Sequence, residues 1–121
     1  MKRTVIVGAT DNPARYAYMA ANMLKEKGFE IVPLGIKKGK VAGEDILDIR
    51  EKPDVGPVHT ITLYIGPQRQ PELYDYLISL KPQRIIFNPG TENSEFESLA
   101  QKNGIETYRN CTLVLLSTRQ Y

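Results

Sequence analysis

Groups that can bind phosphate follow the first β-branched run of the chain, Thr4 to Val7. Gly8 lets another group approach the backbone closely, and Thr10 and Asn12 offer side-chain hydrogen bonds. A helix beginning after this segment would add the partial positive charge of its N-terminus, and Arg15 would add a fixed cation. A tight turn at Gly8 followed by a side-chain cap of that helix is the structural alternative. The residues leave these two interpretations open.

Three lysines, Lys37, Lys38 and Lys40, follow the second apolar run, which ends Pro33-Leu34-Gly35-Ile36. NAD-dependent enzymes place an acidic residue at this point to bind the ribose hydroxyls. Lysines instead favour a ribose that carries a phosphate, as in coenzyme A and NADP. A solvated basic turn would look the same in the sequence. The G-x-G-x-x-G dinucleotide motif is absent, because only its first glycine is present.

Two later loops are small and polar, namely Gly66-Pro67-Gln68 and the segment Asn88-Pro89-Gly90-Thr91-Glu92-Asn93. Each follows a predicted strand and precedes a predicted helix, so an extended ligand could pass over its backbone. Capping of the following helix by Thr91 or Asn93 is the structural alternative.

The spacing of apolar residues predicts alternating strands and helices, which would hold these loops in place. We expect strands at 4–7, 29–34, 59–65, 84–87 and 105–108, and helices at 13–27, 71–80, 94–102 and in the tail after 110. Between 35 and 57 we expect a loop with a short edge strand near 41–42 and a helical turn. This order predicts an α/β, Rossmann-like doubly wound fold: a mostly parallel sheet of five to six strands with helices on both faces, in three layers. Residues 1–121 would form one domain, with the loops gathered at the carboxyl ends of the strands.

Composition excludes several classes of protein. The net charge of +2, from 16 basic and 14 acidic residues, leaves no large field for binding nucleic acid. No apolar run is long enough to span a membrane, and the N-terminus has no signal-peptide pattern. The single cysteine, Cys111, fits a reducing compartment, so we expect a cytoplasmic protein. The sequence leaves the oligomeric state open, with a homodimer as one option.

The sequence contains no recognisable catalytic or metal-binding set. His59 is the only histidine and precedes a strand, where a structural role is expected. Cys111 is expected to be a buried thiol. The carboxylates near residue 95 are interpreted as first-turn helix residues. We therefore expect binding without catalysis.

An ordered series of segments resembles the small CoA-binding domain proteins, whose domain is similar to the CoA-binding domain of succinyl-CoA synthetase and related ADP-forming acyl-CoA synthetases. The series covers nearly the whole chain and comprises Val5-Ile6-Val7-Gly8-Ala9-Thr10 through Arg15-Tyr16, Gly28 to Pro33, Val41-Ala42-Gly43, Asn88-Pro89-Gly90 with Asn93, and Gly104-Ile105 through Asn110-Cys111.

The resemblance implies three contacts with coenzyme A. Gly8, Ala9, Thr10 and Arg15 would lie near the pyrophosphate, Pro33 through Lys38 near the adenosine, and the loops at Gly66 and Asn88 to Gly90 along the pantetheine. The chain departs from the family pattern in three places: Pro33-Leu34-Gly35-Ile36 replaces Pro-Val-Asn-Pro, Asn88 lies in place of a glutamine, and Tyr16 replaces a small residue.

The leading hypothesis is a stand-alone, non-catalytic module that binds coenzyme A or acyl-CoA as a carrier, sensor or regulator. The small-molecule ligand could alternatively be NADP, in an oxidoreductase-like protein. A third hypothesis is a protein-interaction subunit with a vestigial nucleotide site.

Overall fold

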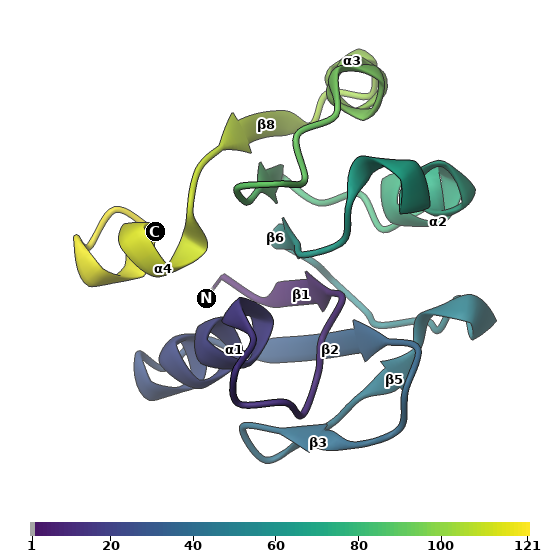
Figure 1. Ribbon diagram of the computed structural model, residues 1–121. Helices are drawn as coiled ribbons and strands as arrows, with labels where there is room; N and C mark the ends of the chain where they lie inside the picture. The colour runs from purple at the N-terminus through teal and green to yellow at the C-terminus, as the bar shows by residue number, and fades with distance from the viewer. Residues whose placement is uncertain (1) are drawn as a thin grey trace.

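A six-stranded, entirely parallel sheet forms the centre of the computed structural model, which describes residues 2–121 (Figure 1). Its strand order is β5-β2-β1-β6-β7-β8. The strands are β1 (Thr4–Val7), β2 (Ile31–Gly35), β5 (Leu47–Asp48), β6 (Thr60–Leu63), β7 (Arg84–Phe87) and β8 (Glu106–Arg109). The four central strands are buried along almost their whole length, as expected for a parallel sheet covered on both faces.

Helices cover both faces of the sheet, so the predicted three-layer, Rossmann-like fold is confirmed. They are α1 (Tyr16–Glu26), α2 (Tyr74–Ser79), α3 (Ser94–Lys102) and α4 (Thr112–Ser117). Because side chains alternate along a strand, Ile6 packs with α1 and α4 while its neighbours Val5 and Val7 pack with α2 and α3. Each face therefore has its own hydrophobic core (Figure 1).

The first helix begins three residues later than its predicted start at residue 13. Asn12 accepts a hydrogen bond from the backbone N–H of Ala14 through Oδ1 and from that of Arg15 through its carbonyl. These bonds close a turn before the helix, and Arg15 takes an extended conformation at the N-cap. The helix therefore begins at Tyr16, and Asn12 shapes the turn ahead of it.

The segment between β2 and β6 was predicted only in part. A strand near residue 41 was expected at the edge of the main sheet, but β3 (Lys40–Val41) pairs antiparallel with β4 (Glu44–Asp45) in a separate hairpin. The edge strand is instead β5, followed by the 3₁₀ turn η1 (Ile49–Glu51), which is the expected helical turn. Ile46 and Val41 are buried under the hairpin against α1, which explains why this apolar pair does not extend the main sheet.

The remaining elements lie close to their predicted positions. The helix expected at 71–80 is divided into the 3₁₀ turn η3 (Pro71–Leu73) and α2, after a further turn η2 (Pro67–Arg69). The tail forms a helix, as expected, and Tyr121 then packs on Phe29, with the Arg84 guanidinium 4.5 Å from its ring centroid. Within the described residues, no helix is long and apolar enough to cross a membrane.

Candidate functional site

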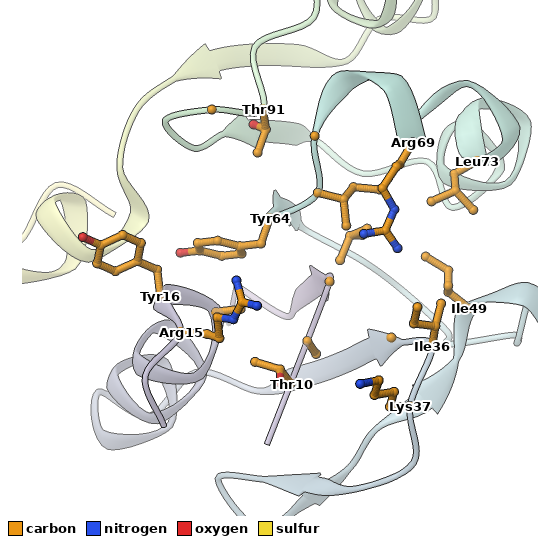
Figure 2. Close-up of a pocket in the computed structure, with 18 of the residues that line it drawn as sticks. Thr10, Arg15, Tyr16, Ile36, Lys37, Ile49, Tyr64, Arg69, Leu73 and Thr91 are labelled. Atoms are coloured by element: carbon orange, nitrogen blue, oxygen red, sulfur yellow. The ribbon is translucent and has the colours of Figure 1, made fainter. Parts of the chain in front are cut away.

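A cavity of about 820 Å³ opens at the carboxyl ends of the central strands (Figure 2). Loops after β1, β2, β5, β6 and β7 all contribute to it, as expected where the strand order reverses direction in a doubly wound sheet. Its lining consists of Val7, Gly8, Ala9, Thr10, Arg15, Tyr16, Ala17, Gly35, Ile36, Lys37, Ile49, Arg50, Lys52, Tyr64, Ile65, Gly66, Arg69, Glu72, Leu73, Pro89, Gly90 and Thr91.

The loop after β1 is held tightly against the end of β2. The backbone N–H groups of Gly8 and Ala9 both donate to the Leu34 carbonyl, at 3.0 and 2.9 Å. Gly8 has φ +93°, which favours glycine, and a Cβ at Gly35 would lie only 2.6 Å from the Ala9 carbonyl oxygen. These two N–H groups are therefore used within the protein and are not free to bind a phosphate.

Free donors lie instead at the N-terminus of α1. Tyr16 and Ala17 are its first residues and line the cavity, and first-turn N–H groups have no acceptor within their own helix. Thr10 Oγ1 accepts from the backbone N–H of Asn12 at 3.1 Å, and its hydroxyl can still donate toward the cavity. The partial positive charge of the helix and the Arg15 guanidinium both favour an anion here.

One end of the cavity is strongly basic. Lys37, Arg50, Lys52 and Arg69 line this part, with Glu72 as the acidic residue among them, and Ile36, Ile49 and Leu73 supply apolar walls. Figure 2 shows Lys37, Ile36, Ile49, Arg69 and Leu73 on the same side of the pocket. We call this part the basic end.

The Arg50 side chain is fixed by its neighbours. Its Nε and Nη2 atoms each donate to one carboxylate oxygen of Asp48 at 2.9 Å, and Nη2 also donates to the Ile36 carbonyl at 3.3 Å. The hydrogen bonds from Arg50 lower the pKa of Asp48, so that carboxylate stays ionised.

Apart from Arg15, the opposite end of the cavity has no charged side chain within residues 2–121. Tyr16, Tyr64 and Thr91 lie there (Figure 2). Pro89 and Gly90, which directly precede Thr91, also line the cavity. We call this part the tyrosine end. Among the described residues, the buried Tyr64 hydroxyl forms no hydrogen bond of good geometry, although the Thr62 and Thr112 hydroxyls lie near it. Burial raises the pKa of Tyr64 to about 12, against a smaller opposing effect from the nearby threonine hydroxyls.

Side-chain amides of Gln70 and Asn93 hold the loops that form this end in place. Gln70, fully buried, donates to the carbonyls of Ile65 and Thr91 at 3.0 and 2.9 Å, which ties the loop after β6 to the loop after β7. Asn93 donates to Gln70 Oε1 and to the Tyr74 hydroxyl, and its Oδ1 accepts from the backbone of Phe96. Asn93 therefore caps α3, which was the structural alternative.

The Asn88 side chain also forms hydrogen bonds inside the protein. It is 3% exposed, its Nδ2 donates to Thr62 Oγ1 and the Leu63 carbonyl at 2.7 and 2.8 Å, and its Oδ1 accepts from the backbone of Thr112 at 2.8 Å. The side chain thus joins β6, β7 and the start of α4, and it does not line the cavity.

The cavity brings together nine of the predicted site residues: Gly8, Ala9, Thr10, Arg15, Gly35, Lys37, Gly66, Pro89 and Gly90. Seven lie outside its lining: Asn12, Pro33, Leu34, Lys38, Pro67, Asn88 and Asn93. Leu34 nevertheless positions the first loop through its carbonyl, and Asn12 shapes the same loop.

The sequence analysis missed Arg50, Lys52, Arg69 and Tyr64. Tyr64 and Arg69 could have been found, because they lie in or beside the loop after a predicted strand. Arg50 and Lys52 could not, since β5 is only two residues long and no pattern marks it as part of the main sheet.

Two residues considered for chemistry lie outside the cavity. His59 lies at the amino end of β6, bonds Thr60 Oγ1, and has a pKa lowered by burial and by Arg84. Cys111 is half-buried at the N-cap of α4. Within residues 2–121, no group of three or more His, Cys, Asp or Glu is placed to hold a metal ion.

The fold and the position of the cavity are those of a Rossmann-like α/β protein. Residues 2–117 match the family described as CoA binding domain, so the chain belongs to the CoA-binding domain family. No curated protein matches the sequence.

Solved structures agree with this assignment. A crystal structure of an uncharacterized protein is 52% identical, with a TM-score of 0.96, over 100% of this chain and 98% of that chain. A conserved hypothetical protein from Pyrococcus furiosus is 26% identical, with a TM-score of 0.78, over 94% and 98%. A Thermus thermophilus protein is 20% identical, with a TM-score of 0.87 over 99% and 90%, and supports the fold alone.

Replacing Asn88 tests its structural role. In Asn88→Ala, three buried groups, on Thr62, Leu63 and Thr112, each lose a hydrogen bond, so the free energy of unfolding should fall by about 2 kcal/mol or more. Urea unfolding monitored by circular dichroism measures this change. The exposed Asn110→Ala is the matched control and should change stability by less than about 0.5 kcal/mol. Equal stability of the two variants would contradict the assigned role.

The Tyr64 phenol should make stability depend on alkaline pH. Its pKa is about 12 in the folded protein and about 10 in the unfolded chain, so from pH 10 upward the unfolded state loses this proton first. The free energy of unfolding should therefore fall between pH 10 and 12, and fall less steeply in Tyr64→Phe. Unfolding curves collected across this pH range test the prediction, and identical slopes for both proteins would refute it.

Proposed function

We propose that this protein binds coenzyme A or acyl-CoA in the cavity. It would be a non-catalytic module that acts as a carrier, sensor or regulator. The proposal extends the family assignment to a specific ligand pose. The pyrophosphate would lie at the N-terminus of α1, the adenosine and its phosphate at the basic end, and the pantetheine arm at the tyrosine end.

The uneven charge of the cavity is the observation that carries this proposal. Coenzyme A has its three phosphates in one half and an uncharged arm in the other. Lys37, Arg50, Lys52 and Arg69 gather at one end, whereas the tyrosine end presents phenol rings and the Pro89-Gly90 backbone. Pairing the negative phosphates with the basic end orients the ligand in one direction only.

Arg15 has the central role in this pose. It is exposed, forms no ion pair among residues 2–121, and lies between the two ends next to the free N–H groups of α1. A guanidinium donates two parallel hydrogen bonds to a phosphate, which a lysine cannot reproduce. We therefore assign Arg15 to the pyrophosphate.

Thermal unfolding with coenzyme A, dephospho-coenzyme A, NADP and NAD tests the proposal. Coenzyme A at a hundred times its dissociation constant should stabilise the protein by about 2.7 kcal/mol, which raises Tm by several degrees. Arg15→Ala should weaken binding about tenfold through loss of a charge-assisted hydrogen bond, while the exposed, distant Lys102→Ala should bind as the wild type does.

Other outcomes of this experiment would redirect the assignment. A larger shift with NADP than with coenzyme A would favour the oxidoreductase-like alternative. If none of the four ligands raised Tm, the proposal would be wrong, and the search would turn to protein partners.

A further inference from the structure

Lys52 has a backbone conformation that lysine rarely adopts. It ends η1 with φ 49° and ψ 56°, in the left-handed region, and its N–H donates to the Ile49 carbonyl at 3.0 Å. Glycine or asparagine would form this turn with less strain. Within residues 2–121, Ala42, Lys81 and Arg119 also have a positive φ, but of these four residues Lys52 alone lines the cavity. Strain at a cavity-lining residue points to a binding role for its side chain.

The pairing of β2 with β5 directs two separate chain segments into the basic end. Gly35 of β2 lies opposite Asp48 of β5, so the residues that follow each strand leave the sheet side by side. Lys37 enters the cavity from the first segment, and Arg50 and Lys52 enter from the second. Three cations from two separate segments of the chain thus converge.

The other lysines of the Lys37–Lys40 cluster point elsewhere. Lys40 begins the β3–β4 hairpin and lies 3.7 Å from the Asp45 carboxylate, and its side chain is 72% exposed. Lys38 is exposed, and neither residue lines the cavity. The sequence cluster therefore contributes one lysine to the basic end.

We propose that Lys52, assisted by Arg50 that Asp48 holds in place, is the specificity determinant that recognises the phosphate on the ligand's ribose. This inference rests on the proposed function, and it moves phosphate recognition from the lysine turn to the turn after β5. Lys52 forms no ion pair within residues 2–121, so its ammonium is free to pair with a phosphate dianion. Arg50 contributes its remaining N–H groups from a fixed position.

Titration calorimetry with coenzyme A and dephospho-coenzyme A tests the inference, because the two ligands differ only in the 3′-phosphate. In Lys52→Gly, affinity for coenzyme A should fall about tenfold while affinity for dephospho-coenzyme A stays unchanged. The unliganded variant should unfold at the same or a higher urea concentration, since glycine accepts the left-handed conformation. Arg50→Ala should also reduce the preference for coenzyme A.

Lys40→Ala is the matched control and should keep the wild-type ratio of the two affinities. If Lys52→Gly kept that ratio while the wild type bound coenzyme A, the inference would be wrong and the proposed function would stand. If the ratio fell in Lys40→Ala instead, recognition would return to the lysine turn. If the wild type bound neither ligand, the proposed function and this inference would both be wrong.

Discussion

The shape of the cavity depends on one acceptor, the Leu34 carbonyl. It accepts hydrogen bonds from both Gly8 and Ala9, which brings the loop after β1 across the end of β2. This approach requires a positive φ at Gly8 and leaves no room for a side chain at Gly35. The same bonds use the N–H groups of the loop, so the N–H groups that remain free to bind an anion are those at the N-terminus of α1. Gly35, in place of the family's asparagine, is thus explained by packing against Ala9.

Side-chain amides provide the second constraint, on the opposite wall. Gln70, Asn88 and Asn93 use their polar atoms to tie the loops after β6 and β7 to the sheet and to each other. Removing any one of them would leave buried partners without hydrogen bonds, which costs more than a surface contact gains. The cavity is therefore built on positions fixed by the fold, and its charged side chains, such as Lys37 and Arg69, are exposed.

The sequence predicted the scaffold better than the site. Strands such as Arg84–Phe87 carry a strong apolar pattern and were located correctly, and the loops after them are functional candidates in any parallel sheet. Side-chain direction is not encoded in such patterns. Asn88 and Asn93 were predicted as ligand contacts, but their amide groups bond other parts of the protein. Lys52 enters the cavity because a two-residue strand joins the sheet.

The central claim is tested most directly by an NMR titration of the whole protein with coenzyme A, in which the chemical shifts of the backbone amides are followed. The account predicts the largest changes at Thr10, Tyr16 and Ala17, where the pyrophosphate would meet the start of α1, and only small changes at His59 on the opposite edge of the sheet. Shifts centred on His59, or none at a saturating concentration of coenzyme A, would contradict the claim that this cavity is the binding site.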